Sequence, residues 1–132
     1  MELSLPSLTI ITIVYNRVKD IEYTLKSITE QTYKNIEYIV IDGNSNDGTL
    51  DIIQKYLDKI NHLVSEKDNG IYDAMNKGLR LATGDYVLFI NGGDNLHQKN
   101  TIENIFQIFD NKNQGTPDLI FGECMLVDNH RN

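Results

Sequence analysis

The sequence is poor in cysteine and in basic residues, and both shortages exclude classes of protein. Cys124 is alone among 132 residues, so no internal disulfide can form. Lys and Arg total 12 against 19 Asp and Glu, which gives a formal net charge of -7. Without an overall basic field the chain is not attracted to a polyphosphate backbone, and we expect no nucleic-acid partner.

Long apolar runs and a leader segment are also lacking. The longest nearly apolar stretch, Leu8 to Tyr15, is far shorter than the roughly 20 residues of a membrane helix. The first residues show neither the basic start nor the apolar segment of a secretory signal. We therefore expect a cytoplasmic protein with no transmembrane segment.

What is present fits one globular α/β domain over residues 1–132. With 40% hydrophobic and 23% charged residues, the chain can form a single core. β-Branched runs alternate with stretches of helical periodicity, and several runs are too continuously apolar to have a wet face, which favours a mostly parallel sheet. The expected strands are Leu8 to Val14, Ile36 to Asp42, His62 to Glu66, Asp85 to Ile90 and Leu119 to Cys124.

Four helices are expected beside these strands, each with one apolar face toward the sheet. Their buried sets are Val18, Ile21, Leu25 and Ile28; Ile52, Ile53, Tyr56, Leu57 and Ile60; Ile71, Met75, Leu79 and Ala82; and Ile102, Ile105, Phe106 and Phe109. We expect Asn100 to cap the fourth helix, with Glu103 reaching back to it. That helix should end within Asn111 to Gly115.

Polar residues follow each of the first four expected strands. Ligands of open α/β sheets bind beyond the carboxyl ends of the strands, so these segments form the candidate site. Turn and capping chemistry explains any one segment alone, and for Asp42 by itself a structural turn is the favoured interpretation. The four together favour a ligand site; they are Tyr15 to Arg17, Asp42 to Thr49, Glu66 to Gly70 and Asn91 to Asn95.

Asp94 is the candidate metal ligand. It follows Gly92 and Gly93, which let a ligand approach the backbone closely. A carboxylate placed there suits Mg²⁺ or Mn²⁺ held by one or two carboxylates and substrate phosphate oxygens. The P-loop, dinucleotide and nucleophile-elbow patterns are absent, and the three histidines are scattered, which argues against ATP hydrolysis, a dinucleotide fold, serine hydrolysis and zinc.

Two groups of segments resemble family 2 glycosyltransferases with the GT-A fold. The first group matches the start of that domain, and the second matches its middle. They are Thr9 to Arg17, Ser27-Ile28, Gln31 to Tyr33 and Glu37 to Thr49, then Asp68 to Gly78, Ala82 to Tyr86 and Asn91 to Asp94. The resemblance extends from about Leu8 to Asp128 and is greatest to bacterial enzymes of capsule and exopolysaccharide assembly.

The resemblance implies a Rossmann-like GT-A three-layer α/β/α sandwich, here truncated to its donor-binding part. It implies inverting, metal-dependent transfer from a nucleotide-diphosphate sugar, with uridine as the base, to a saccharide or lipid-linked acceptor in polysaccharide synthesis. A lipid-linked acceptor would place the protein at the inner face of the membrane. The implied nucleotide-sugar contacts are Tyr15, Asn16, Arg17, Asp42, Asp68, Asn76 and Gly93, with Asp94 on Mn²⁺ or Mg²⁺.

The chain departs from the family pattern at several points. Gly43 replaces the second of two consecutive acids, so that contact must come from Asp42 or be absent. Gly93 precedes Asp94 where two acids are common, which predicts weak metal binding without nucleotide. Met75 replaces an Arg, a loss that Arg17 or Lys77 can compensate. The acceptor portion is missing, and the general base is expected beyond residue 132.

Two alternatives stay open. One is a degenerate domain that serves in protein association, because a fold alone does not fix a function. The other is a phospho-acceptor signalling domain, which needs an acidic pair after the first strand, where this chain has Tyr15-Asn16. An uncovered sheet edge near Leu119 to Leu126 would also favour self-association.

Overall fold

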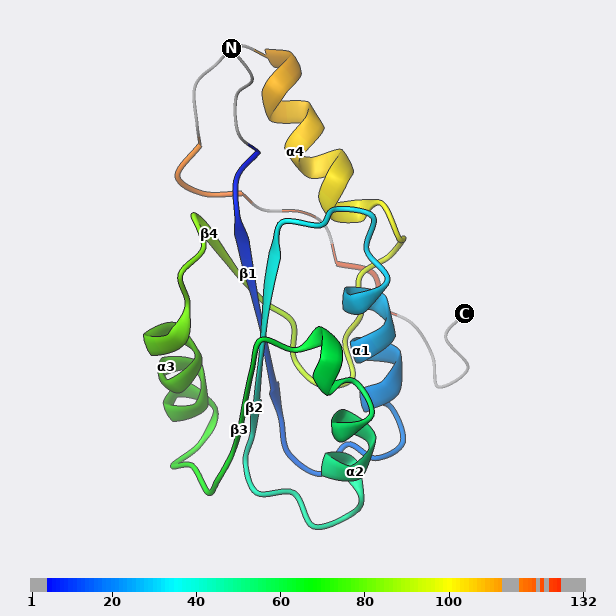
Figure 1. The fold of residues 1–132 in the computed structure, drawn as a ribbon, viewed down its shortest axis with the longest axis vertical. Helices are drawn as coiled ribbons and strands as arrows, with labels where there is room; N and C mark the ends of the chain where they lie inside the picture. The colour runs from blue at the N-terminus through cyan, green and yellow to red at the C-terminus, as the bar shows by residue number, and fades with distance from the viewer. Residues whose placement is uncertain (1–4, 113–116, 121, 123, 127–132) are drawn as a thin grey trace.

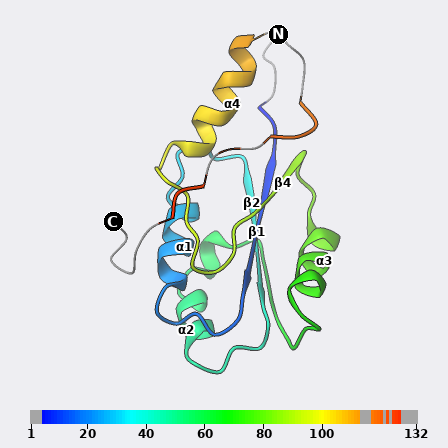
Figure 2. The same ribbon diagram turned by 180° about the vertical axis from the view of Figure 1, so that it is seen from behind.

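The computed structural model of the chain describes residues 5–112, 117–120, 122 and 124–126. In these residues one sheet lies between two helical layers, with α3 on one face and α1 and α2 on the other (Figure 1). The view from behind shows the same three layers, with α4 near the start of β1 (Figure 2). The expected α/β/α arrangement is therefore confirmed.

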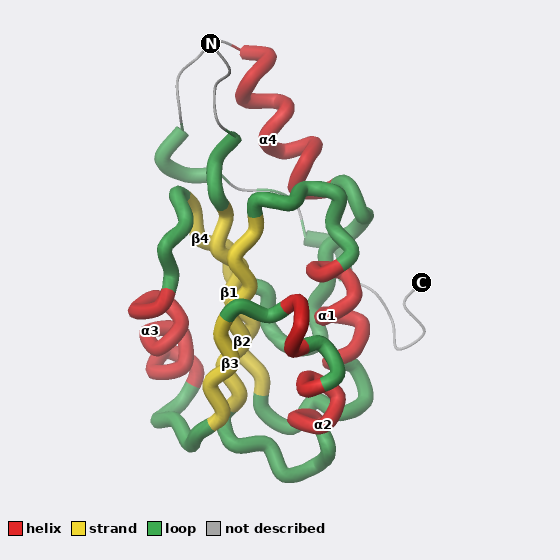
Figure 3. Tube along the Cα trace, in the orientation of Figure 1, coloured by secondary structure: helices red, strands yellow, loops and turns green. Residues whose placement is uncertain are grey.

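The sheet contains four described strands, and every pair is parallel. The order is β3-β2-β1-β4, with β1 at Leu8–Val14, β2 at Ile36–Asp42, β3 at His62–Ser65 and β4 at Tyr86–Phe89. The bounds of β1 and β2 agree with the prediction, whereas β3 and β4 are slightly shorter than predicted. All four carboxyl ends point toward the bottom of Figure 3, where the polar loops gather.

The helices bury faces of different character. α1 covers Ile21–Thr29, α2 Thr49–Gln54, α3 Ile71–Leu81 and α4 Thr101–Lys112. α1, α2 and α4 pack large apolar side chains into one core cluster, which includes Ile10, Leu25, Tyr38, Ile53 and Phe106. A smaller cluster of Ile11, Ile39, Ile41 and Ala74 lies under α3.

The predicted buried face of α3 is wrong for Ile71 and Leu79, whereas Ala82 packs against the smaller cluster as predicted. Ile71 and Leu79 are 49% and 44% exposed, while Ala74 and Gly78 are buried against the sheet. A Cβ at position 78 would lie 2.6 Å from Ile11 Cγ2, so the helix backbone lies very close to β1. The small residues allow this approach, and Ile71 and Leu79 turn outward.

The first two helices are shorter than their apolar spacing suggested. α1 begins at Ile21, which leaves Val18 exposed in the preceding loop. α2 ends at Gln54 and is followed by a separate 3₁₀ turn, Leu57–Lys59. Leu57 is 48% exposed, so its predicted burial is wrong, because the chain breaks its helical path before reaching it.

The start of α4 is capped differently from the prediction. Gln31 Oε1 accepts a hydrogen bond from the Ile102 amide at 3.2 Å. Glu103 accepts one from Thr32 Oγ1 at 2.7 Å rather than reaching back to Asn100. A segment distant in sequence thus supplies the cap, while Ile102 and Phe106 are buried as predicted. The side chain of Phe109 lies outside the described residues.

The expected fifth strand does not form in the residues that the structure describes. Leu119, Ile120, Gly122 and Cys124 belong to no strand, and positions 121 and 123 lie outside the described residues. Leu119 is 78% exposed, whereas Ile120 is partly buried against the larger core cluster. β4 is therefore the edge of the described sheet, and self-association through an edge stays a prediction.

None of the helices within the described ranges has the length and apolar character needed to cross a bilayer.

Candidate functional site

A pocket of about 610 Å³ opens at the carboxyl ends of the strands. Loops after all four strands contribute to it, as expected for a ligand site of an open α/β sheet. The lining residues are Ile13, Val14, Tyr15 and Arg17 after or on β1; Gly43, Asn44 and Asn46 after β2; Lys67, Asp68, Gly70 and Ile71 after β3; and Asn91 and Gly92 after β4.

Three of the predicted contact residues line this pocket. They are Tyr15, Arg17 and Asp68. Tyr15 is 59% exposed at the rim, so its ring is available to a ligand. Arg17 lies 3.6 Å from Asp20 in an ion pair that keeps the guanidinium near the pocket. Lys67 adds a second cation, and sequence reasoning missed it although it lies within the polar segment after β3.

Asp42 lies outside the lining and is fully buried. Its carboxylate accepts hydrogen bonds from Ser45 N at 3.1 Å, Ser45 Oγ at 2.5 Å and Ser65 Oγ at 2.7 Å. These bonds tie the end of β2 to its own loop and to the end of β3. In this structure the Asp42 carboxylate therefore shapes the pocket from beneath rather than facing it.

Asn16 also organises the loop after β2. It adopts a φ of 50°, and its amide N–H donates to Ser45 Oγ at 2.9 Å. Its side-chain oxygen accepts the Asn46 N–H at 2.9 Å. The two loops after β1 and β2 are thus locked together, which fixes Asn46 and Asn44 at the pocket wall.

Asp47 caps the start of α2, as turn chemistry allows. Its Oδ1 accepts hydrogen bonds from Thr49 N at 3.0 Å and Thr49 Oγ1 at 2.5 Å. The Thr49 hydroxyl bond is the main reason that the pKa of Asp47 lies below its usual value. Thr49 Oγ1 in turn accepts the Arg17 N–H at 2.8 Å, which ties this cap to the end of β1.

Asp68 stands directly over Gly43. A Cβ at position 43 would lie 2.8 Å from Asp68 Oδ2, so the glycine leaves room for this carboxylate. Asp68 Oδ1 accepts the Gly70 N–H at 3.0 Å. The sequence suggested Asp42 as the source of an acidic contact at this corner of the site, but the acid that lines the pocket there is Asp68.

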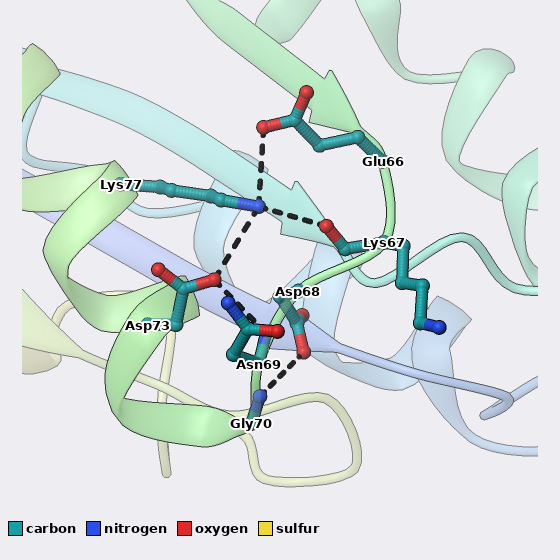
Figure 4. Close-up of polar contacts among 7 residues, drawn as sticks. All are labelled: Glu66, Lys67, Asp68, Asn69, Gly70, Asp73 and Lys77. Atoms are coloured by element: carbon teal, nitrogen blue, oxygen red, sulfur yellow. Dashed lines mark hydrogen bonds and ion pairs between the residues drawn. The ribbon is translucent and has the colours of Figure 1, made fainter.

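Lys77 lies behind the pocket and not in its lining. Its ammonium is 3.1 Å from Glu66 Oε1, 3.6 Å from Asp73 Oδ2 and 3.1 Å from the Lys67 carbonyl oxygen (Figure 4). Burial lowers the pKa of Lys77, but the Glu66 hydrogen bond and the surrounding acids outweigh it and raise the pKa. The sequence-based role of Lys77 as a phosphate partner is not supported by this placement.

The loop after β4 carries Gly93 and Asp94, which lie outside the pocket lining. Gly93 has a φ of 106°, and a Cβ there would lie 3.3 Å from Asp20 Oδ2. Asp20 Oδ1 is buried without a hydrogen-bond partner among the described residues. Asp94 is exposed, and its N–H bonds to the Asn91 carbonyl at 3.0 Å.

This loop offers a cation few protein ligands. Within the described ranges no three His, Cys, Asp or Glu side chains come close enough to hold a metal ion. One exposed carboxylate fits a Mg²⁺ or Mn²⁺ ion that takes its other ligands from phosphate oxygens and water. It does not fit a metal held by the protein alone. Asn76 lies on the exposed side of α3 and is also outside the lining.

Comparison with known proteins finds a matching protein family and related sequences. The model of the family described as "Glycosyl transferase family 2" matches residues 9–129. A "PGL/p-HBAD biosynthesis glycosyltransferase" of Mycobacterium bovis BCG is 31% identical over 124 residues, which cover 92% of this chain and 48% of the relative. "Glycosyltransferase AglE" of Haloferax volcanii is 32% identical over 104 residues, which cover 75% of this chain and 34% of the relative.

Solved structures of glycosyltransferases resemble this chain as well. Residues 1–349 of S. aureus TarS in complex with UDP-GlcNAc superpose with a TM-score of 0.71 and 27% identity, covering 89% of this chain and 38% of that one. The mannosyltransferase PcManGT of Pyrobaculum calidifontis, in complex with GDP-Man and Mn²⁺, superposes with a TM-score of 0.67 and 30% identity. The match covers 73% of this chain and 30% of that one. The chain spans about half the length of the mycobacterial relatives it matches.

Proposed function

Because the chain belongs to glycosyltransferase family 2, we propose that its strand-end pocket holds the nucleotide-diphosphate part of a sugar donor. The observation that carries the proposal is the convergence of Tyr15, Arg17 and Asp68 on one pocket from the loops after β1 and β3. UDP-sugar is the proposed donor, by resemblance and because one superposed structure contains UDP-GlcNAc. Residues 1–132 would form the donor-binding part of the transferase.

The pocket residues suit different parts of such a donor. The exposed ring of Tyr15 offers a stacking surface for a base, and the Asp68 carboxylate can accept N–H or O–H donors of the base or ribose. Arg17 and Lys67 supply positive charge for phosphate oxygens. Asn16 and Asp42 hold the loops that shape the pocket. We propose Asn76 and Gly93 as contacts to the sugar-diphosphate end.

Asp94 is the proposed protein ligand for Mn²⁺ or Mg²⁺. When bound, the ion would stabilise the charge that develops on the leaving diphosphate. Because Asp94 is a single exposed carboxylate, the ion should bind only weakly before the nucleotide arrives. Metal and nucleotide should therefore strengthen each other's binding by the same factor.

The complete reaction is proposed for the whole protein. It would transfer the sugar with inversion to a saccharide or lipid-linked acceptor in bacterial polysaccharide synthesis, at the inner face of the membrane. No general base is assigned to a residue of this chain.

Calorimetric titration with UDP, GDP and their sugars, each with and without Mn²⁺, tests the proposal. One nucleoside diphosphate should bind in a metal-dependent way and raise the melting temperature; at a ligand concentration of 100 Kd the gain is about 2.7 kcal/mol. Absence of binding by every nucleotide would contradict donor binding and leave an association domain as the better interpretation. Stabilisation by a phosphoryl analogue alone would indicate a phospho-acceptor domain instead.

Replacement of Asp94 tests the metal assignment. Asp94→Ala should abolish the metal-dependent part of nucleotide binding and leave the melting temperature of the free protein nearly unchanged, because the side chain is exposed. Asp51→Ala, also exposed but on α2, is the matched control and should keep metal-dependent binding. Equal metal dependence in the Asp94 variant and in the wild type would contradict the assignment.

A further inference from the structure

The loop from Glu66 to Gly70 forms one wall of the pocket and is held from α3. Lys67, Asp68 and Gly70 line the pocket, so the position of this loop sets the shape of the wall. On the side away from the pocket, Lys77 Nζ reaches both Glu66 Oε1 and the Lys67 carbonyl at 3.1 Å (Figure 4). The loop is therefore fixed by a side chain that no ligand in the pocket would touch.

Asp73 completes the attachment one helical turn before Lys77. Its Oδ2 accepts the Asn69 N–H at 2.9 Å and lies 3.6 Å from Lys77 Nζ. The Asn69 hydrogen bond is the largest cause of the lowered pKa of Asp73, as expected for a carboxylate whose charged form accepts a backbone N–H. Backbone atoms on both sides of Asp68 are thus bound to α3, through Lys67 and Asn69.

Lys77 differs from the other lysines that form ion pairs in the described residues. Its side chain is only 15% exposed, whereas Lys26 and Lys99 are 55% and 74% exposed. Exposed pairs contribute little because water competes for both charges and the long side chains lose freedom. A shielded ammonium with two acids and a carbonyl around it is a more rigid attachment.

The opposite side of Asp68 is fitted to Gly43. Asp68 Oδ2 occupies the space that a Cβ at position 43 would take, at a distance of 2.8 Å. Because Oδ1 is tied to the Gly70 N–H, the carboxylate cannot simply rotate away. The position of the Asp68 carboxylate therefore depends both on the attachment of its loop to α3 and on the absence of a side chain at Gly43.

We propose that Lys77 is a positioning residue for the pocket, which fixes the loop from Glu66 to Gly70 so that the Asp68 carboxylate stands over Gly43 and faces the ligand. The part that concerns the ligand rests on the proposed function. Lys77 acts through Asp68 and does not contact the nucleotide. Its removal should therefore weaken nucleotide binding only while Asp68 is present.

Hydrogen exchange in the ligand-free protein tests the attachment without any nucleotide. In Lys77→Met, the Asn69 and Gly70 amides should exchange faster, because the loop opens more often. Lys99→Met, which removes an exposed ion pair with Glu30, is the matched control and should leave both amides unchanged. Asp73→Asn is a milder second variant in case Lys77→Met folds poorly. Unchanged exchange of both amides in folded Lys77→Met and Asp73→Asn would overturn the attachment.

UDP titration in the presence of Mn²⁺ tests the effect on the site. Lys77→Met should bind UDP about tenfold more weakly, the loss expected when one charged hydrogen bond is misplaced. Lys77→Arg keeps the charge and should recover part of that loss. In an Asp68→Ala background, Lys77→Met should cause no further loss, a result that general destabilisation would not produce.

The outcomes separate the two proposals. If the wild type binds no nucleotide, the proposed function fails, while the exchange experiment still decides whether Lys77 holds the loop. If the wild type binds UDP and Lys77→Met binds it equally well, the positioning role is overturned. Losses from Lys77→Met and Asp68→Ala that multiply in the double variant would also overturn it, because the two residues would then act independently.

Gly43→Ala tests whether the missing side chain at Gly43 helps to place the Asp68 carboxylate. The added methyl group should displace the Asp68 carboxylate and weaken UDP binding, again by about tenfold. Combined with Asp68→Ala, the same substitution should have no further effect on binding, because the obstructing carboxylate is gone. A loss that persists at full size in the double variant would contradict the fitted arrangement.

Discussion

The two faces of the sheet are built from side chains of different size. On the face covered by α1, α2 and α4, residues such as Leu25, Ile53 and Phe106 interlock in the larger cluster. On the other face α3 presents Ala74 and Gly78 to the sheet. Large side chains bury more apolar area, whereas small ones let a helix approach closely. The first face therefore supplies most of the stability, and the second places a helix accurately.

The close approach of α3 has a direct consequence for the pocket. With Gly78 against Ile11, the preceding turn of the helix lies beside the carboxyl end of β3. Asp73 and Lys77 can then reach the loop that carries Asp68. A helix held farther away by large residues would leave these contacts too long. Four expected results, in order of decreasing size, test this division between the two faces.

The largest effect is expected from Leu25→Ala on the α1 face. Leu25 is fully buried, and its truncation should cost about 2–5 kcal/mol of unfolding free energy by lost transfer energy and cavity formation. Urea denaturation measures this loss of unfolding free energy. Exchange of the Asn69 amide in the folded variant should stay as in the wild type. A loss below about 1 kcal/mol would contradict the view that this face carries the stability.

Gly78→Ala should have the next largest effect and should reach the site. Its Cβ would lie 2.6 Å from Ile11 Cγ2, and such overpacking costs about 1–3 kcal/mol, partly offset by the roughly 1 kcal/mol better helix propensity of alanine. The displaced helix should also speed exchange of the Asn69 amide. Gly122→Ala, with no atom within 4 Å of its Cβ, is the control. If the two variants have equal unfolding free energies and equal exchange rates of the Asn69 amide, close packing of α3 is refuted.

Leu79→Gln should change stability by about 0.5 kcal/mol or less, because the side chain is 44% exposed. Helical periodicity alone predicts a core position and a much larger loss. Thermal and urea unfolding of this variant therefore distinguish the two orientations of α3. A loss comparable with that of Leu25→Ala would restore the orientation predicted from the sequence.

The smallest effect is expected from acid titration of Asp73. The Asn69 hydrogen bond holds its pKa below the usual 3.8, so its stabilising contribution is present above that value and disappears as the pH falls through the lower, folded-state pKa. Asp73→Asn should flatten the dependence of the urea midpoint on pH in this acidic range. Asp51→Asn, at an exposed position of α2, is the control. An unchanged slope in the Asp73 variant would argue against a bound carboxylate.

Much of the fold follows from local patterns. The bounds of β1 and β2 agree with the prediction because their apolar runs are long and end at polar turns. The apolar face of α3 was misassigned because periodicity identifies a stripe but not its direction. Ile71 and Leu79 face outward, because the small residues Ala74 and Gly78 lie where α3 comes closest to the sheet.

The candidate site was predictable to a similar degree. Polar segments at strand ends identified Tyr15, Arg17 and Asp68, which all line the pocket. The different duties of Asp42 and Asp68 were not predictable. Asp42 ends β2 and Asp68 follows β3, but the Asp42 carboxylate accepts hydrogen bonds from Ser45 and Ser65, whereas the Asp68 carboxylate accepts one from the Gly70 N–H. Among these partners Ser65 comes from a distant segment, and its contact with Asp42 depends on the register in which β2 pairs with β3.

The sequence by itself determined the α/β class, the parallel sheet and the polar strand ends, because apolar periodicity and turn residues act over a few neighbouring positions. The tertiary structure alone decided which face of α3 is buried, that Gln31 caps α4, and that Lys77 holds the loop of Asp68. Each of these depends on distances between segments far apart in the chain. Packing sets such distances once the whole sheet has formed.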